Sequence, residues 1–354
     1  MPPLRTAGGP GLFLGRRPVC YTAVIRAIRI HENGGPEVMR WESIQLPPPA
    51  AGEVRVRHTA IAVNFSDVNV RRGGFYISDA QVFPLIPGNE AAGIVAGLGS
   101  GVTGVGAGES VAYVGTGGPF YEKTGSYAEE RNVPADCLVR LPRGISERTA
   151  AAFLLKGLTA AMIVKRVFRP GPEDTVLVHA AASGVGLLLC QWSKHLGARV
   201  IGTVGSAEKA RVARSHGCDH VFLYADFPEQ VKKLAPGGVS AVFDGVGRDT
   251  FERSIACVRR FGTLVNYGNA SGHVPPLDLL LLAKHGSLTV SRPAFSHYIA
   301  DCGGLAPACA ELFDLVLRGV LKVEIGRSYA LSDAATAHRD LEARAFSGSA
   351  VLIP

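Results

Sequence analysis

A turn built almost entirely from small residues separates two apolar runs near the middle of the chain, Val176-Leu-Val-His-Ala-Ala-Ala-Ser-Gly-Val-Gly-Leu-Leu-Leu-Cys190. The first run predicts a strand that ends at His179, and the second predicts a helix that begins near Gly184. The first N–H groups of a helix have no partner within it, and the helix dipole adds positive charge there. Small residues let an anion such as a pyrophosphate reach those groups. The alternative is a tight turn in which glycine is needed for packing alone.

From about Ser146 onward, β-rich runs alternate with helical stretches. The predicted strands are Thr175–His179, Arg199–Gly202, His220–Tyr224, Ser240–Asp244, Gly262–Tyr267 and Ser287–Ser291. The predicted helices are Glu147–Phe168, Gly184–Leu196, Ala207–His216 and Ala306–Arg318. Such alternation is typical of βαβ units, which build a parallel sheet covered by helices on both faces.

The region before this alternation has a different pattern. The run from Glu53 to Val63 begins with strict apolar/polar alternation, which predicts a half-buried strand. Prolines at 47–49 and a run of glycines between 93 and 108 mark closely spaced turns. Short strands with such punctuation over residues 27–140 predict a β-rich barrel or sandwich, so the whole chain is of the α/β class.

The end of the second predicted strand indicates which nicotinamide cofactor fits. In dinucleotide folds an acid about 20 residues beyond the glycine turn accepts hydrogen bonds from the ribose 2′-hydroxyl. Here Ser183 plus 20 is Thr203, and no acid occurs in 203–207, while Lys209 follows shortly after. A cation and hydroxyls favour a 2′-phosphate, so we expect NADPH rather than NADH. The alternative is that Lys209 is an ordinary surface lysine of a helix.

The net charge of +7 does not indicate a nucleic-acid partner. Residues 1–26 hold four arginines and no acid, so the remaining chain carries only +3, without a Lys/Arg block. We interpret this N-terminal leader as a disordered extension, with a targeting segment as the alternative. The longest apolar run, 150–164, is interrupted by Lys156 and is too short to cross a membrane.

The seven cysteines are odd in number and include no C-x-x-C pair. They predict neither a disulfide framework nor a structural zinc lobe, and they favour a reducing, cytoplasmic compartment.

Several further stretches, together with the glycine turn, resemble one family. The matching segments are Asn64–Asp67, Pro87–Gly93, Lys156–Thr159, His179–Gly186, Gln191–Ala198, Ile201–Ser206, Asp244–Thr250, Tyr267–Gly272 and Ser347–Pro354. They are similar to NADPH:quinone oxidoreductases, the zeta-crystallin-like, zinc-free branch of the medium-chain dehydrogenase/reductase superfamily. The resemblance extends from about Ala27 to Pro354. It implies a GroES-like domain of residues 27–148 with 295–354, a Rossmann domain of residues 149–294, and a homodimer formed through an edge strand near Ser287–Ser291.

The resemblance also implies a site in the cleft between the domains. It places the pyrophosphate on Ser183, Gly184 and Val185. The adenosine 2′-phosphate would be surrounded by Gly205, Ser206, Lys209, Tyr224 and Arg344. The remaining cofactor contacts would come from Asp67, Thr159, Val246, Tyr267, Gly268, Asn269 and Phe295.

Three positions depart from the family pattern. Ser183 stands where relatives commonly have glycine, and its hydroxyl could bind or crowd the phosphate. Asn69 and Phe75 fall in the implied substrate pocket where relatives often carry tyrosine, which leaves the selectivity for quinones open.

The stretch Ala62-Val-Asn-Phe-Ser-Asp67 contains no cysteine, although alcohol dehydrogenases of the superfamily hold a catalytic zinc through a cysteine at the position of Asn64. No cysteine occurs between Cys20 and Cys137, so a thiolate zinc site cannot be built there. We therefore expect no metal and no alcohol dehydrogenase activity. Asn64 becomes a candidate catalytic donor to a quinone oxygen, with a helix-capping role as the alternative.

The expected function is transfer of hydride or electrons from NADPH to an electron-poor acceptor. A quinone is the first expectation and a conjugated enone or alkenal the second. A non-catalytic NADPH-binding protein is the alternative from a different class.

Overall fold

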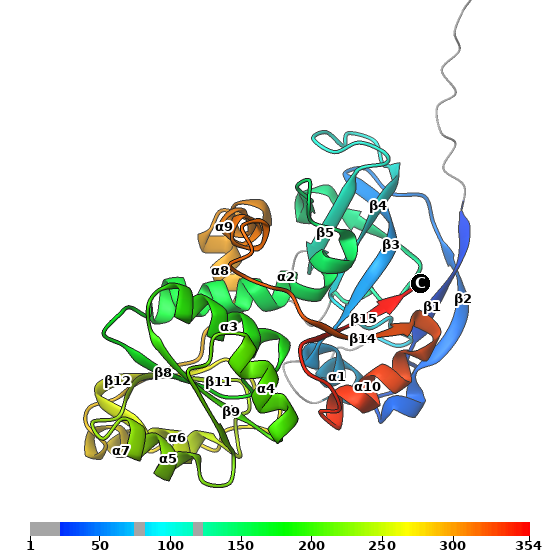
Figure 1. Ribbon diagram of the computed structural model, residues 1–354. Helices are drawn as coiled ribbons and strands as arrows, with labels where there is room; N and C mark the ends of the chain where they lie inside the picture. The colour runs from blue at the N-terminus through cyan, green and yellow to red at the C-terminus, as the bar shows by residue number, and fades with distance from the viewer. Residues whose placement is uncertain (1–21, 74–81, 116–122) are drawn as a thin grey trace, which may run out of the picture.

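The computed structural model describes residues 22–73, 82–115 and 123–354. It has two lobes, each built on its own sheet, and helix α2 (Glu147–Met162) runs between them (Figure 1). One lobe is β-rich and the other is a parallel sheet with helices on both faces, so the expected α/β class is confirmed. None of the helices among the described residues is long and apolar enough to span a membrane.

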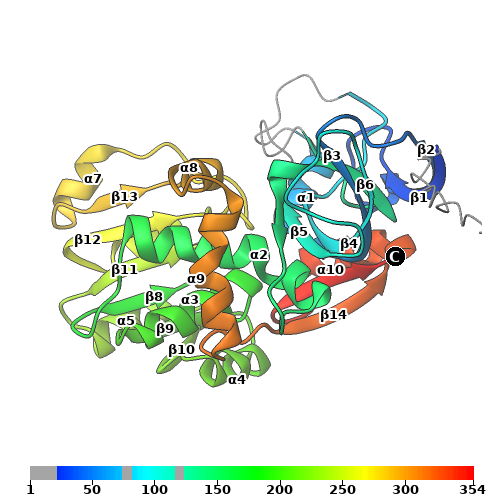
Figure 2. The same ribbon diagram turned by 90° about the horizontal axis from the view of Figure 1, so that it is seen from above.

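The six-stranded sheet is parallel and has the strand order β10-β9-β8-β11-β12-β13 (Figure 2). Its strands are β8 (Thr175–Val178), β9 (Arg199–Val204), β10 (His220–Leu223), β11 (Val239–Asp244), β12 (Val258–Asn266) and β13 (Thr289–Ser291). The chain moves outward from β8 to β10 and then crosses back to start β11 on the other side of β8. In such sheets ligands bind in the crevice at the carboxyl ends of the strands where the order reverses. Here those strands are β8 and β11.

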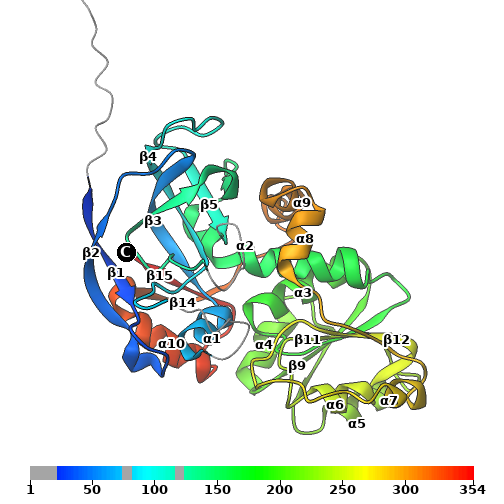
Figure 3. The ribbon, with the colours of Figure 1, turned by 180° about the vertical axis from the view of Figure 1, so that it is seen from behind.

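Helices cover both faces of this sheet (Figures 1 and 3). On one face lie α3 (Gly184–His195) and α4 (Ala207–Ser215), and on the other lie α5 (Phe227–Leu234), α6 (Phe251–Ile255) and α7 (Leu279–Lys284). The apolar run of β8 is continuous because both of its faces are buried. Val176 and Val178 pack in the core beneath α3, whereas Leu177 packs on the opposite side with Phe227 and Phe251.

The seven-stranded sheet draws on both ends of the chain. Its strands are β3 (Glu53–Val63), β4 (Glu90–Leu98), β5 (Ser110–Val114), β6 (Glu130–Pro134), β7 (Leu138–Arg140), β14 (Ile325–Ala330) and β15 (Ser349–Ile353). The strand predicted to begin at Glu53 is confirmed as β3, and β15 pairs with it, placing Ala350 opposite Val63. A separate hairpin is formed by β1 (Ala23–Arg29) and β2 (Arg40–Leu46), and α1 (Phe65–Arg72) and α10 (Ala334–Glu342) complete this lobe.

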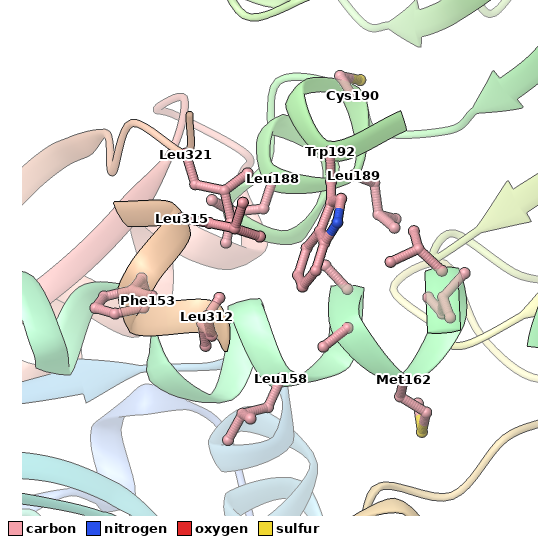
Figure 4. Close-up of a cluster of buried hydrophobic side chains, with 14 of the residues drawn as sticks. Phe153, Leu158, Met162, Leu188, Leu189, Cys190, Trp192, Leu312, Leu315 and Leu321 are labelled. Carbon is pink, nitrogen blue, oxygen red and sulfur yellow. The ribbon is translucent and has the colours of Figure 1, made fainter. Parts of the chain in front are cut away.

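A large apolar core joins α2, α3 and α9 (Figure 4). Phe153 and Leu158 of α2, Trp192 of α3, and Leu312 of α9 (Leu305–Leu317) are all buried in it. Helix α2 is followed by a π-helical turn, Ile163–Val167, where the sequence predicted continuous helix to Phe168. Helices α8 (Phe295–Asp301) and α9 pack against α2, which α9 crosses at a large angle (Figure 2). The first strand after residue 294 to join the seven-stranded sheet is β14. The domain boundaries at 148 and 295 stay predictions.

Candidate nucleotide cleft and active site

The glycine turn leads from β8 into α3, as the sequence predicts. The Ser183 hydroxyl is the N-cap of α3 and accepts a hydrogen bond from the Gly186 amide at 3.1 Å. A Cβ atom at Gly186 would lie 2.2 Å from the Ala180 carbonyl oxygen, and one at Gly184 would lie 2.6 Å from Lys156 Cδ. Packing alone therefore requires glycine at 186, where the crowding atoms are backbone, whereas at 184 the crowding atoms belong to the side chains of Lys156 and Ser349. The turn also places the N-terminus of α3 at the crevice between β8 and β11.

The residues expected around the 2′-phosphate come from three separate segments and meet in the structure. Lys209 of α4 donates from Nζ to the carbonyl oxygen of Arg344 at 2.5 Å. Burial and then the charge of Arg344 lower the pKa of Lys209, as expected when two cations lie close together. Tyr224, at the end of β10, accepts a hydrogen bond from the Ala180 amide at 2.8 Å, and the charge of Arg344 reaches it too. The cluster is a candidate anion site.

Two residues beside this cluster shape the space around it. Ser206 is the N-cap of α4 and accepts from the Lys209 amide at 3.3 Å. A Cβ atom at Gly205 would meet no heavy atom within 4 Å, so the backbone there borders open space. This space lies at the strand end that lacks an acid.

The residues expected near the nicotinamide lie on α2, at the start of α8 and at the carboxyl ends of β11 and β12. Val246 follows β11, and its amide donates to Asp244 Oδ1 at 2.8 Å. The Tyr267 ring lies against Gly245. Further along, the Asn269 amide bridges the Gly268 carbonyl oxygen, at 2.8 Å, and Arg292, at 3.0 Å.

Thr159 of α2 and Phe295, the first residue of α8, are the other two expected nicotinamide contacts. The Thr159 hydroxyl donates to the carbonyl oxygen of Leu155 in its own helix.

Val185, expected at the pyrophosphate, is the second residue of α3 and packs against the large core. Asn69 lies on α1, and its backbone carbonyl oxygen accepts a hydrogen bond from the Gly73 backbone N–H. Phe75 lies outside the described residues.

Asn64 is part of a buried polar cluster that the sequence did not predict. Its Nδ2 donates to Glu90 Oε2 at 2.8 Å, and its Oδ1 accepts from Lys156 Nζ at 2.7 Å. Lys156 Nζ also lies 4.0 Å from Glu90. Asn64 is also the N-cap of α1, and its backbone N–H donates to Asp67 Oδ2 at 2.9 Å. The helix-capping alternative therefore describes part of the role of Asn64. The visible signal for this cluster was Lys156, a charge inside an apolar helical run.

A second buried chain of hydrogen bonds leads from Asp67 to the C-terminal helix. Arg71 can only donate, so His338 Nδ1 accepts from it at 3.2 Å and the His338 proton lies on Nε2. His338 Nε2 then donates to Tyr127 at 2.9 Å, and Tyr127 donates to Asp67 Oδ2 at 3.1 Å. Arg71 also pairs with Glu342 at 2.6 Å. The chain fastens α10 to α1 beside the cleft.

Burial raises the pKa of Asp67 to about 7, against the opposing effect of its hydrogen bonds. Because this value exceeds the unfolded value near 4, folding takes up a proton at Asp67, and stability falls as pH rises from about 4 to 7. The full effect is on the order of 4 kcal/mol. We expect Asp67→Asn to flatten this dependence in denaturant unfolding from pH 4.5 to 7.5. A residual slope is expected from Glu90, whose pKa burial also raises.

The control for this experiment is Asp249→Asn, which changes an exposed acid and leaves the slope as in the wild type. An Asp67→Asn protein with the full wild-type slope contradicts the prediction.

The buried cluster does not fit a zinc ion. Among the residues that the structure describes, no group of three or more His, Cys, Asp or Glu side chains converges to hold a metal. At the position where zinc enzymes of the superfamily have a thiolate, the Asn64 amide oxygen is already bound by an ammonium group. A cation at that point repels a second cation, and an amide is a poor zinc ligand. The chemistry of the donor set at Asn64 is therefore unsuited to a zinc ion.

Comparisons with known proteins agree with the fold and the cleft. Residues 50–143 match the family described as alcohol dehydrogenase GroES-like domain, and residues 184–309 match the one described as zinc-binding dehydrogenase. Quinone oxidoreductase 1 of Escherichia coli is 42% identical over 332 residues, which cover 92% of this chain and 99% of that protein. A 2-haloacrylate reductase of a Burkholderia species is 38% identical, covering 94% of this chain and 99% of that protein.

A solved structure of Escherichia coli quinone oxidoreductase complexed with NADPH is similar over its whole length. The TM-score is 0.87 at 42% identity, and the match covers 93% of this chain and 100% of that one. Identity at this level over nearly the whole chain confirms the resemblance found in the sequence motifs. The chain belongs to the quinone oxidoreductase family of medium-chain dehydrogenases and reductases.

Proposed function

We propose that the protein is an NADPH-dependent quinone oxidoreductase. The observation that carries the proposal is the convergence of Lys209 and Arg344 at a strand end without an acid, which suits a 2′-phosphate. The Escherichia coli relative supports it, because that protein is a quinone oxidoreductase and was solved with NADPH.

In this proposal the chain's own residues bind and orient the coenzyme. The amides at the N-terminus of α3 receive the pyrophosphate, and Lys209, Arg344, Ser206 and Tyr224 hold the 2′-phosphate. The residues that would flank the nicotinamide ring are Thr159, Val246, Tyr267, Asn269 and Phe295. When bound, NADPH supplies a hydride, and the protein contributes alignment.

The acceptor must accept hydride without a metal to polarise it. Asn64 donates one of its two side-chain amide hydrogens to Glu90, and within the part of the chain that the structure describes the other is left for a bound oxygen. Quinones and conjugated enones stabilise the incoming charge through their own carbonyl groups. These two classes of acceptor therefore fit the buried amide and ammonium better than an alcohol does.

An acceptor screen with metal-depleted protein tests the proposal. We expect NADPH oxidation with 1,4-benzoquinone or 9,10-phenanthrenequinone to be at least about tenfold faster than with a 2-alkenal, and a chelator to have no effect. The 38% identical 2-haloacrylate reductase favours an enone-type reductase as the second candidate, which a reversed order of rates would support. NADPH binding without turnover of any acceptor would indicate a non-catalytic NADPH-binding protein.

We also propose a homodimer formed through the β13 edge of the six-stranded sheet. Within the described residues β13 pairs only with β12, so its outer edge is open. Three large apolar side chains near this edge are exposed, Phe261 (80%), Leu279 (73%) and Leu280 (65%). An open strand beside exposed apolar groups suits a second copy of the same chain.

Sedimentation velocity tests this dimer. Wild type is expected to sediment as a dimer, and Phe261→Glu combined with Leu280→Glu is expected to give monomers. Val24→Glu, which changes a side chain that is 72% exposed in the β1–β2 hairpin, is the control and leaves the dimer intact. A dimer that persists in the double variant places the interface elsewhere.

A cytoplasmic, reducing location is part of the same proposal. The six cysteines of the described residues are free thiols, and the Cys218 thiol donates a hydrogen bond to Cys190 Sγ at 3.2 Å without a disulfide between them. A reducing compartment keeps such a neighbouring pair as thiols.

A further inference from the structure

Lys156 presents a buried ammonium group with unused hydrogen-bond donors. Its side chain is 9% exposed, and an ammonium carries three N–H donors. Among the residues described by the structure, one donor is used, in the 2.7 Å bond to Asn64 Oδ1. Burying a charge without full pairing is costly, so such a group is a candidate for a functional role.

The nearest acid compensates for this charge only from a distance. Glu90 Oε2 lies 4.0 Å from Lys156 Nζ. Its carboxylate is bonded instead to the Leu155 amide at 2.7 Å and to Asn64 Nδ2 at 2.8 Å. Glu90 therefore stabilises the ammonium electrostatically and leaves its donors available.

Lys156 lies where the two lobes meet. Helix α2 packs against β3 and β4 of the first lobe and against α3 of the second. The aliphatic part of Lys156 lies against Gly184, the first residue of α3. Thr159, expected beside the nicotinamide, follows three residues later on α2 and so lies on the same side of the helix. The ammonium is thus placed between Asn64 and the N-terminus of the nucleotide helix.

We propose that Lys156 is the proton donor to the reduced acceptor, an inference that rests on the proposed function. The hydrogen of the hydride ends on one carbonyl oxygen of the quinone, and the electron pair that comes with it leaves the other carbonyl oxygen as an oxyanion. An N–H bond of Lys156 then breaks as an O–H bond forms on that oxygen, which completes a hydroquinone. The neutral amine regains its proton from water. Before that transfer the ammonium stabilises the growing negative charge.

The pH dependence of this step follows from the surroundings of Lys156. Burial lowers the pKa of the ammonium, and the facing acids Glu90 and Asp67 oppose that effect. Because the donor must be protonated, kcat is expected to fall as pH rises through the pKa of Lys156.

The test measures kcat against pH for wild type, Lys156→Met and the double variant Glu90→Gln, Lys156→Met, with a quinone and saturating NADPH. The double variant removes both charges and so leaves no unpaired carboxylate in the cluster. It therefore serves as the test if the single variant folds poorly. We expect both variants to bind NADPH with a Kd within twofold of wild type and to lose at least about tenfold in kcat. Their kcat should also no longer decrease as the pH rises into the alkaline range. Lys165→Met, which removes an exposed lysine after α2, is the control with wild-type kcat.

Other outcomes have distinct meanings. A double variant with wild-type kcat and pH profile overturns the role of Lys156 while leaving the proposed function intact. A rise in the Kd for NADPH at unchanged kcat overturns it too, because it assigns Lys156 to the coenzyme site. If none of the acceptors supports NADPH oxidation by the wild-type protein, the proposed function and this inference are overturned together.

Discussion

Replacing Lys209 and Arg344 together by alanine is expected to lower kcat/KM for NADPH by about 100-fold and to leave kcat/KM for NADH within about threefold. In the proposed site each cation would donate a charge-assisted hydrogen bond to the 2′-phosphate, worth about 1.5 kcal/mol at the lower end of the usual range. NADH lacks this phosphate and therefore loses nothing. The ratio of the two efficiencies, measured with one quinone, checks the prediction.

The single variants Lys209→Ala and Arg344→Ala should each lower kcat/KM for NADPH about tenfold. The control is Arg211→Ala, which changes another cation of α4. Lys209 bonds the carbonyl oxygen of Arg344, so the two residues are coupled and their effects need not add. Equal use of both coenzymes by wild type and the double variant would show that Lys209 is an ordinary surface lysine.

Gly186→Ala is expected to destabilise the protein by about 3 kcal/mol and to abolish NADPH binding. The added Cβ would lie 2.2 Å from the Ala180 carbonyl oxygen and 2.9 Å from Ala181 Cα, so the turn must open. Alanine favours a helix over glycine by only about 1 kcal/mol, which the clash exceeds. Thermal unfolding and the quenching of NADPH fluorescence measure the two effects.

Gly205→Ala is the matched variant, because its Cβ meets no heavy atom within 4 Å. We expect its free energy of unfolding to stay within about 0.5 kcal/mol of wild type. Its Kd for NADPH should rise, since the methyl group enters the space beside Ser206 and Lys209. Wild-type stability of Gly186→Ala would contradict the packing explanation of the turn.

The βα alternation after Ser146 was readable from the sequence because a parallel sheet buried on both faces needs continuous apolar strands. Thr175–His179 and Ala207–His216 were predicted to within one residue of β8 and α4. Short helices such as α6 and α7 were missed, since five or six residues show too little periodicity. The motifs also predicted the family, which the relatives confirm.

The sequence pattern attributed the glycines of the turn to the approach of a ligand, with packing of the turn as the alternative. The structure supports the packing alternative at Gly186, where an added Cβ would lie 2.2 Å from a backbone carbonyl oxygen, while at Gly184 it would meet the Lys156 side chain. Which neighbours crowd a glycine depends on chain segments far away in sequence, here Lys156 of α2, and no local pattern reports them.

By itself, the sequence determined the α/β class, the family and the absence of an acid after the second nucleotide strand. These properties depend on residues close together along the chain, where periodicity and spacing express local geometry. Only the tertiary structure decided that Lys156, Asn64 and Glu90 form one buried cluster. It also supplied the direct contact of Lys209 with Arg344, two residues that the family resemblance had placed around one phosphate. Contacts between residues 92 or 135 positions apart arise from how the two lobes and the C-terminal segment pack, and one sequence carries no local signal for them.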